Sequence, residues 1–125
     1  MTQGQPVISE VFPSGLTYGQ FVAAAKSNKA GFEQNYREFT LADADRNFFA
    51  GLNARVGPMK VLAIVEDWCP DVVRGLPVVA RLTEACGMEL RLFHRDQNPA
   101  LMGMYLKEGK YMSIPVFAFF DKGFR

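Results

Sequence analysis

The chain lacks the features that mark a nucleic-acid-binding, membrane-spanning or metal-binding protein. Its 125 residues carry a formal net charge of +1, two cysteines and one histidine. No run of lysine or arginine offers the basic surface that nucleic acid requires. No apolar stretch approaches the roughly 18 to 20 residues of a membrane span, and one histidine with two distant cysteines makes no credible metal site. We therefore expect no nucleic-acid partner, no membrane association and no bound metal.

The N-terminal segment, residues 1–6, also lacks the basic region and the apolar run of a signal peptide. Because disulfides form mainly in secreted proteins, two cysteines without such a signal indicate free thiols in a reducing compartment. The expected location is the cytoplasm.

Apolar residues are plentiful: they make up 49% of the chain, and phenylalanine alone occurs eleven times. This composition predicts a packed interior rather than disorder. The length fits one domain with a substantial core.

Hydrophobic periodicity predicts the order of helices and strands. Helices are expected over residues 17–26, 30–38, 41–55, 70–86 and 99–108, and strands over residues 7–12, 60–65, 89–93 and 116–120. Thr17 and Thr40 are the expected N-caps of the first and third helices. The buried stripe of the third helix is expected to comprise Leu41, Ala44, Phe48 and Leu52.

A strand, a helix and a strand follow one another over residues 60–93, which predicts two parallel strands joined by a crossover helix. The sequence Asp121-Lys122-Gly123 predicts a hairpin turn into one more, antiparallel strand. The expected fold is therefore α/β, with a mixed central β-sheet flanked by helices.

Cys69 is the candidate catalytic residue because it lies where the predicted strand over residues 60–65 gives way to the predicted helix over residues 70–86. Backbone N–H groups and the helix dipole at such a helix start stabilise a thiolate, and we expect the thiol to be exposed. Asp71 in the first turn opposes this effect because it carries a negative charge. Trp68 is either a flat platform beside the thiol for a bound partner or a half-buried aromatic side chain.

A second cysteine three residues further on would complete a dithiol, but that position holds Val72. Cys86 cannot take its place, since the intervening helix separates the two cysteines by roughly 25 Å and a disulfide needs Cα atoms within about 7 Å. Cys86 is expected to be a buried structural thiol. His94 is expected to be a surface or satisfied side chain, and Arg74 and Arg81 to line a solvated helix face.

Several short matches, in the same order along the chain, resemble thioredoxin. They are Trp68-Cys69, Pro77 eight residues after the cysteine, Asp96-Gln97-Asn98-Pro99, Ile114-Pro115, and Phe120 with Gly123. The resemblance covers residues 60–125 and implies a thioredoxin-like fold with a cis bond before Pro115. The run Cys69-Pro70-Asp71-Val72 is similar to the motif of a thioredoxin-like branch, Cys-Pro-Asp-Cys, with its second cysteine lost.

Two further positions depart from thioredoxin. The buried acid that the family carries six residues before the nucleophile is Ala63 here, and a lysine four residues before the Asp-Gln-Asn-Pro segment is Leu92. In the family that acid helps to deprotonate the second cysteine. Loss of the resolving cysteine together with these groups argues against an efficient dithiol reductase.

The resemblance implies that Cys69 reacts within a substrate groove that comprises Trp68, Pro70, Asp71, Val72, Ile114 and Pro115. The leading hypothesis is a monothiol oxidoreductase. Cys69 would form a mixed disulfide with a protein or small-molecule thiol or disulfide, and an external thiol such as glutathione would resolve it. No other cofactor is expected.

Two alternatives use the same groove or the same thiol. The first is a redox-inactive binding module, in which the backbone of Ile114 beside a cis Pro115 pairs with an extended peptide. The second is an iron–sulfur carrier that uses two Cys69 thiolates and glutathione, for which no glutathione-binding pattern is evident.

Residues 1–39 precede the strong resemblance and are expected to form a helical extension packed on a thioredoxin-like domain of residues 40–125. The chain stops at Arg125, where thioredoxins continue into a final strand and a helix, so a truncated C-terminus is expected. The sheet left uncovered there would be covered by the helices between Thr17 and Phe39, or by a second chain in a homodimer.

Overall fold

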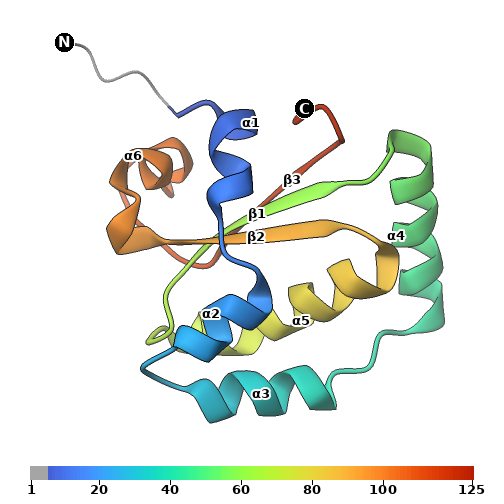
Figure 1. Cartoon of the computed structure of the whole chain (residues 1–125), viewed down its shortest axis with the longest axis horizontal. Helices are drawn as coiled ribbons and strands as arrows, with labels where there is room; N and C mark the ends of the chain where they lie inside the picture. The colour runs from blue at the N-terminus through green and yellow to red at the C-terminus, as the bar shows by residue number, and fades with distance from the viewer. Residues whose placement is uncertain (1–5) are drawn as a thin grey trace.

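A three-stranded mixed β-sheet organises the chain in the computed structural model, which describes residues 6–125 (Figure 1). β1 (Lys60–Val65) lies in the centre of the sheet. β2 (Glu89–His94) pairs with β1 in parallel, and β3 (Val116–Phe120) pairs with its other edge in antiparallel orientation. These pairings confirm the predicted α/β fold with a mixed central sheet.

Helices of very different lengths surround this sheet. In chain order they are α1 (Ile8–Val11), η1 (Phe12–Ser14), α2 (Tyr18–Ala24), α3 (Lys29–Glu38), α4 (Asp43–Val56), α5 (Pro70–Cys86), η2 (Arg95–Gln97), α6 (Pro99–Met102) and η3 (Gly103–Tyr105), where η marks a 3₁₀ helix. Residues 1–5 of the predicted N-terminal extension lie outside the described residues. Within residues 6–125, none of the helices has both the length and the apolar character needed to span a bilayer.

β1 is buried on both faces because its side chains alternate between two cores. Val61, Ala63 and Val65 point to one face, Leu62 and Ile64 point to the other, and all five are fully buried. The continuous apolar run in the sequence predicted this two-sided burial.

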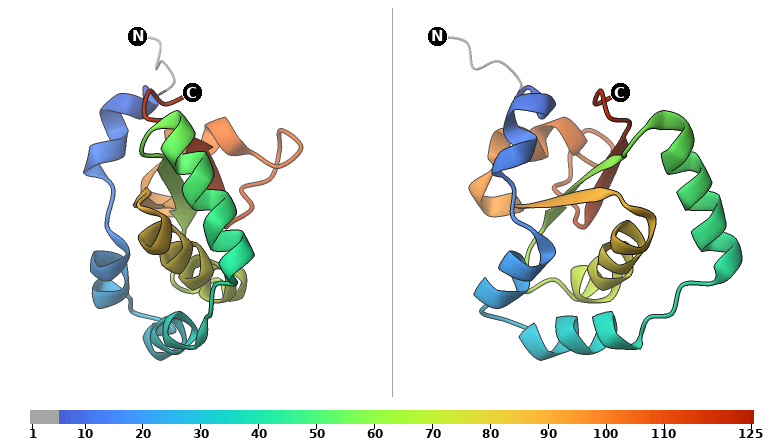
Figure 2. Two further views of the ribbon diagram at one scale, coloured as in Figure 1. Left: turned by 90° about the vertical axis from the view of Figure 1, so that its right-hand side faces the viewer. Right: turned by 45° about the vertical axis from the view of Figure 1, so that its right-hand side comes forward.

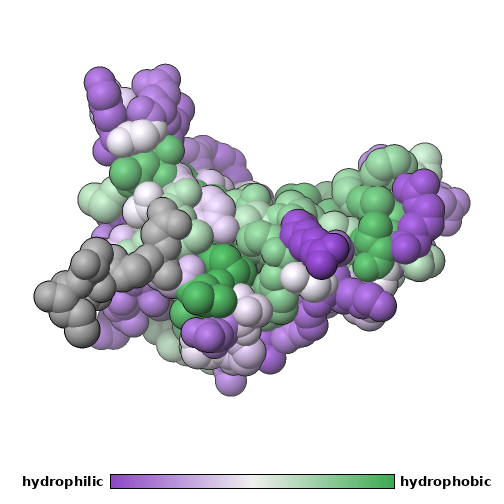
Figure 3. Space-filling view, turned by 90° about the horizontal axis from the view of Figure 1, so that it is seen from above, coloured by the Kyte–Doolittle hydropathy of each residue, from purple (hydrophilic) through white to green (hydrophobic). Residues whose placement is uncertain are grey.

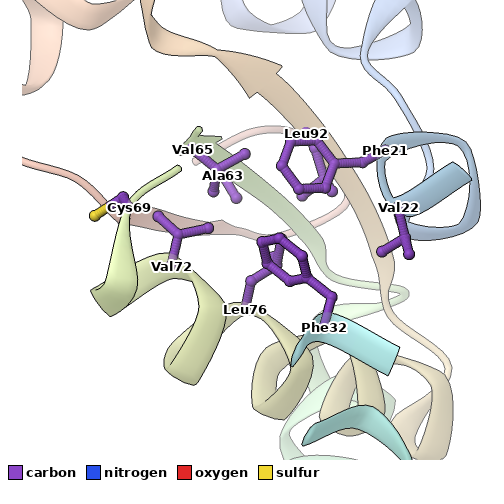
Figure 4. Packing of buried hydrophobic residues seen from close by; sticks show 9 residues of the cluster. All are labelled: Phe21, Val22, Phe32, Ala63, Val65, Cys69, Val72, Leu76 and Leu92. Carbon is purple, nitrogen blue, oxygen red and sulfur yellow. The ribbon is translucent and has the colours of Figure 1, made fainter. Parts of the chain in front are cut away.

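The first face of the sheet is covered by α2 and α5, and α3 packs against both of these helices (Figures 1 and 4). Phe21 and Val22 from α2 and Phe32 from α3 belong to one buried cluster with side chains of β1, β2 and α5. Phe21 and Phe32 meet edge to face, with ring centroids 5.6 Å apart. The division into residues 1–39 and 40–125 stays a prediction, but a single core spans both sides of it.

Thr17 caps α2 as the sequence predicted. Its hydroxyl accepts a hydrogen bond from the backbone N–H of Gln20, and the Gln20 side chain accepts one from the N–H of Thr17. This reciprocal capping box fixes the start of the helix that brings Phe21 to the core.

The opposite face of the sheet is covered by α1, η1 and α6. The predicted strand over residues 7–12 is wrong. A strand would place Ile8, Glu10 and Phe12 on one face, whereas a helical turn brings Ile8, Val11 and Phe12 together. Those three apolar side chains pack on the sheet, so helical spacing gives the better burial.

The chain instead meets the edge of the sheet at Leu16. Leu16 forms an antiparallel bridge with Leu92 of β2, with N–H to O distances of 2.9 and 2.8 Å. Gly15 permits this close approach, because a Cβ atom there would lie 2.7 Å from the Phe93 ring. The bridge connects the N-terminal helices to the outer edge of β2.

α5 begins and ends where the sequence predicted. Cys69 is its N-cap residue and Pro70 its first residue, a position where proline needs no N–H partner. Gly87 ends the helix in the left-handed conformation, with φ of 74°. Pro77 lies inside the helix, at the position predicted from the resemblance.

α4 differs from its prediction at both its start and its buried face. Thr40 does not cap it, since the N-cap residue is Ala42 and makes no side-chain hydrogen bond. Phe48, expected in the buried stripe, is 61% exposed. Leu52 packs on the core as predicted, but its companions there are Phe49 and Val56.

Tertiary contacts explain this rotation of α4. One residue turns a helix face by about 100°, and two adjacent phenylalanines leave that choice to the surface against which the helix packs. α4 stands at one side of the molecule, where hydrophobic and hydrophilic residues lie together on the surface (Figures 2 and 3).

The helix predicted over residues 99–108 is shorter in the structure. The helix that starts at Pro99 ends at Met102 and continues as the 3₁₀ turn η3, rather than running to residue 108. Leu101 and Met102 are already buried on the sheet. Gly103, a poor helix former, follows them.

The predicted turn at residues 121–123 is present, since the Asp121 carboxylate accepts hydrogen bonds from the N–H groups of Gly123 and Arg125. No further strand follows it within residues 6–125. Phe124 instead packs edge to face on Phe12, with ring centroids 5.3 Å apart. Apolar packing over the sheet therefore replaces the expected strand.

Candidate functional site

Cys69 lies at the C-terminal edge of the parallel strands, between the end of β1 and the first turn of α5. Its backbone carbonyl accepts hydrogen bonds from the N–H groups of Val72 and Val73. Cys69 is therefore the residue at which the helix starts, and the positive end of the helix dipole lies at this residue. The position predicted from the sequence is the one observed.

The thiol of Cys69 is less exposed than its position suggested. The residue is 9% exposed, and its Sγ lies 3.9 Å from the carbonyl oxygen of Ile114, to which the thiol donates. In the close-up, the sulfur points away from the other side chains of the core cluster (Figure 4). The backbone at Ile114 therefore lies directly beside the sulfur.

Val72 lies beneath Cys69 rather than at the surface. It is fully buried and packs in the same cluster as Ala63, Val65 and Leu76. Its side chain consequently contributes no exposed area to the predicted groove, because it serves as core support under the first turn of α5. Ala63 is likewise fully buried, so no carboxylate lies at that position below the site.

The segment before β3 forms the opposite wall of the site. The Ile114–Pro115 peptide bond is cis. Ile114 packs against both large core clusters, one on each face of the sheet. The structure thus brings Ile114 to Cys69, 45 residues away in the sequence.

Trp68 directly precedes Cys69 in the chain and is 46% exposed. The guanidinium of Arg95 lies 5.0 Å from the centre of its ring, at a cation–π distance. The role of the exposed part of this ring as a platform for a partner stays a prediction. Tyr111 and Met112, in the segment that leads to Ile114, are also exposed.

Pro70 and Asp71 form the exposed first turn of α5. The Asp71 carboxylate pairs with Arg74 one turn later, and both side chains are largely in solvent. This pairing offsets part of the negative charge that Asp71 brings to the thiol. The second arginine of the predicted solvated face behaves differently: Arg81 donates to the Tyr36 carbonyl and lies over the Tyr36 ring.

A buried polar network lies behind the site. Glu66 is almost fully buried directly after β1, and its two carboxylate oxygens have different partners. One lies 3.0 Å from Nδ1 of His94, and the other accepts the backbone N–H of Asp96 at 2.9 Å. His94 is therefore a satisfied side chain, as predicted, but its partner is a buried carboxylate.

Sequence reasoning did not identify Glu66, Arg95 or Met112 as part of the site. A signal for Glu66 was present, because a charged residue directly after a fully apolar strand has to find partners if it stays buried. The parallel register places Val65 beside His94. Two parallel strands that end together would have indicated that Glu66 and His94 meet. Nothing local indicated Met112.

Cys86 occupies the other end of α5, and both cysteines are free thiols. It is 7% exposed, packs with Met59, Val61 and Met88, and its thiol donates to the Arg46 carbonyl at 3.8 Å. Burial raises the pKa of the Cys86 thiol above its ordinary value. The structure thus places it in the core, as predicted. Among residues 6–125, no three His, Cys, Asp or Glu side chains are grouped so that they could hold a metal ion.

Two solved structures share this architecture over 96% of the chain. One is a protein of unknown function, PA1234, from Pseudomonas aeruginosa, with 17% sequence identity, a TM-score of 0.81 and 73% of that chain covered. The other is an HIV epitope-scaffold, with 17% identity, a TM-score of 0.79 and 73% of that chain covered. At this level of identity the similarity concerns the fold alone.

Comparison with curated proteins gives no match. The family model described as thioredoxin matches residues 15–125, which include the bridge at Leu16, the Cys69 turn and the Ile114–Pro115 bond. The match begins well before residue 40, so it includes most of the N-terminal helices as well. The chain therefore belongs to the thioredoxin family.

Proposed function

We propose that this protein is a monothiol thiol–disulfide oxidoreductase with Cys69 as its nucleophile. The observation that carries the proposal is the placement of a free cysteine at the start of α5, with its sulfur directed to the carbonyl of Ile114. Backbone N–H groups at a helix start favour the thiolate over the thiol.

The reaction has two exchange steps. The Cys69 thiolate attacks one sulfur of a partner disulfide, the partner's S–S bond breaks, and the departing thiolate takes up a proton from solvent. An external thiol such as glutathione then attacks the mixed disulfide as its thiolate. A new disulfide forms between the external thiol and the partner sulfur, and Cys69 is released as a thiolate. The number of disulfides does not change: one partner sulfur leaves as a thiol, and the sulfur of the external thiol takes its place in the new disulfide.

The position of Val72 supports a one-cysteine mechanism. An attack from within the chain would need a thiol one helical turn after Cys69, and that position holds a buried apolar side chain. Cys86 lies at the far end of α5. The partner and the external thiol must then both come from outside, to a groove that comprises Trp68, Pro70, Asp71, Ile114 and Pro115.

The test is to trap the mixed disulfide. Wild-type protein, Cys69→Ser and Cys86→Ser are incubated with oxidised glutathione, and intact masses are measured. We expect one glutathione adduct in the wild type and in Cys86→Ser, and none in Cys69→Ser. Adducts that depend on Cys86 instead would contradict the proposal.

A second candidate function is a redox-inactive peptide-binding module. The observation that favours it is the exposure of three large apolar side chains, Trp68, Tyr111 and Met112, on the two segments that flank Cys69. Cys69→Ser separates the two functions. If it still binds a peptide partner with wild-type affinity while wild-type Cys69 fails to exchange, the binding module is the correct description.

Exchange with an external thiol needs a pool of reduced thiols, which the cytoplasm supplies. We therefore propose a cytoplasmic location and no resident cofactor. A homodimer through the outer edge of β3 remains a proposal for the oligomeric state, and sedimentation of the full chain tests it. That edge has no partner strand within residues 6–125.

A further inference from the structure

Arg95 connects three segments that are far apart in the sequence and meet at Cys69. Its Nε donates to the Asp96 carboxylate at 3.0 Å, and its Nη1 donates to the carbonyl of Met112 at 3.1 Å. Its guanidinium also lies over the ring of Trp68. One side chain thus contacts the residue before the nucleophile and the residue two positions before Ile114.

The contact with Met112 matters because the loop of residues 106–113 has few other attachments. Its remaining hydrogen bonds are internal, between Leu106, Lys107, Gly109, Lys110 and Tyr111. Within residues 6–125, the bond from Arg95 is the one hydrogen bond that connects this loop to another part of the chain. The segment before β3 projects from the body of the molecule (Figure 2).

The backbone next to Arg95 is anchored by the buried carboxylate of Glu66. Glu66 accepts the backbone N–H of Asp96, which fixes the start of η2 to the end of β1. The Arg95 side chain is only 20% exposed, so its contacts with Trp68 and Met112 are partly shielded from solvent. Charge-assisted hydrogen bonds and cation–π contacts gain strength under such shielding.

We propose that Arg95 is a positioning residue that sets the distance between the two walls of the Cys69 groove, Trp68 on one side and the loop of residues 106–113 on the other. The inference rests on the proposed function only in that the groove admits a disulfide-containing substrate. Arg95 does not touch the reacting sulfur. It acts on substrate docking rather than on the chemical step.

Lysine cannot replace arginine here. The two hydrogen bonds use different nitrogens of one planar fork, and the same plane lies over Trp68. A lysine ammonium is a single compact point charge and cannot maintain all three contacts in this geometry. We therefore expect Arg95→Lys to fall between the wild type and Arg95→Met.

The first measurement needs no activity. Trp68 is the one tryptophan of the chain, so acrylamide quenching of tryptophan fluorescence reports on this wall alone. We expect Arg95→Met to increase the quenching constant roughly twofold, because the guanidinium no longer covers the ring. The control Arg46→Met, at an exposed position on α4, should match the wild type. Equal quenching in Arg95→Met and the wild type overturns the proposal.

The second measurement is exchange with a disulfide-linked peptide at saturating glutathione, together with alkylation by iodoacetamide. Arg95→Met should raise KM roughly tenfold through lost docking contacts, with kcat and the alkylation rate within about twofold of the wild type. An unchanged KM overturns the proposal, as does an equal fall in kcat and alkylation, which would indicate damage to the thiol site. If the wild type performs no exchange, the proposed function fails, and quenching alone decides the role of Arg95.

Discussion

The two ends of α5 each carry a buried cysteine, and their comparison shows what makes one of them a candidate nucleophile. Cys69 and Cys86 are 9% and 7% exposed, and each thiol donates to a backbone carbonyl at nearly the same distance, 3.9 and 3.8 Å. Neither burial nor this contact distinguishes them. Solvent exposure alone would therefore not identify which of the two cysteines is the candidate nucleophile.

The difference lies in the helix itself. Cys69 lies at the start of α5, the positive end of the helix dipole, whereas Cys86 lies in the last turn, at the negative end. Asn53 of α4 donates to the Cys86 carbonyl and accepts the N–H of Met59, which closes this end with side chains of the core. At the Cys69 end, by contrast, the neighbouring side chains Trp68, Tyr111 and Met112 are exposed.

The largest expected effect comes from removing each thiol in turn. Cys69→Ser should abolish thiol–disulfide exchange, a loss of at least roughly 10³-fold in rate, because the hydroxyl of serine is not a nucleophile at its ordinary pKa. Cys86→Ser should retain exchange within about twofold. Steady-state reduction of a disulfide-linked peptide by glutathione checks both. Loss of activity in Cys86→Ser alone would reverse the roles assigned to the two ends.

The next effect concerns stability. Phe32→Ala should lower the free energy of unfolding by about 3 to 5 kcal/mol, because Phe32 is fully buried in the core beneath the Cys69 end. Phe49→Ala, on α4 at the Cys86 end, should cost about 1 kcal/mol, because no residue of α4 is fully buried. Urea unfolding measures both. Equal losses would show that α4 is as important to the core as α3.

The elements of the fold also differ in how well the sequence predicted them. β1 and α5 were predictable because their signals are local: a two-sided apolar run, and a helix bounded by Pro70 and Gly87. The buried face of α4 was not, since adjacent Phe48 and Phe49 fit either rotation until the partner surface is known. The segment over residues 7–12 was misread because its six residues fit either period.

In the site, the cysteine and Ile114–Pro115 were predictable from residue identity and order along the chain. The Glu66–His94 pair depends on the register of two strands, and the bond from Arg95 to Met112 depends on the path of a loop. Both are contacts between segments distant in sequence, which periodicity and spacing do not encode. Exposure of Cys69 was overestimated for the same reason, because Ile114 covers it.

Alkylation rates should differ less than exchange rates. We expect Cys69 to react with iodoacetamide roughly tenfold faster than Cys86 at neutral pH. Opposite helix ends differ by about 1 to 2 kcal/mol in their effect on a thiolate, and 1.4 kcal/mol corresponds to a factor of ten. Mass spectrometry of peptides after timed alkylation measures each site separately.

The pH dependence sharpens this comparison. Burial raises the pKa of the Cys86 thiol, so its thiolate forms only above the ordinary range for a cysteine, and its alkylation should increase at higher pH than that of a free cysteine. The pKa shifts upward because burial favours the neutral thiol over the thiolate in the folded protein. Denatured protein is the control, in which both sites should react alike. Faster reaction at Cys86 in the folded protein at neutral pH would contradict the assignment.

The smallest expected effect is the change in the free energy of unfolding when Val72→Cys introduces a second thiol near Cys69. The N–H of Val72 donates to the Cys69 carbonyl, which places the two residues one helical turn apart. The shorter side chain should lower the free energy of unfolding by only about 1 kcal/mol, while oxidation should join residues 69 and 72. Thiol titration should then find three free thiols in the reduced variant and one, Cys86, after oxidation.

Val79→Cys is the matched control for that variant, because it makes the same substitution on the same helix. Residue 79 lies about 10 Å along the helix from Cys86 and about 15 Å from Cys69, too far for a disulfide with either. It should therefore keep three free thiols after the same oxidation. If Val72→Cys also keeps three, then Cys69 does not lie at the start of α5, and the distinction between the two ends of the helix is lost. If it closes its disulfide, disulfide reduction by the variant should still be slow, because the buried position of Ala63 supplies no carboxylate to deprotonate the second thiol.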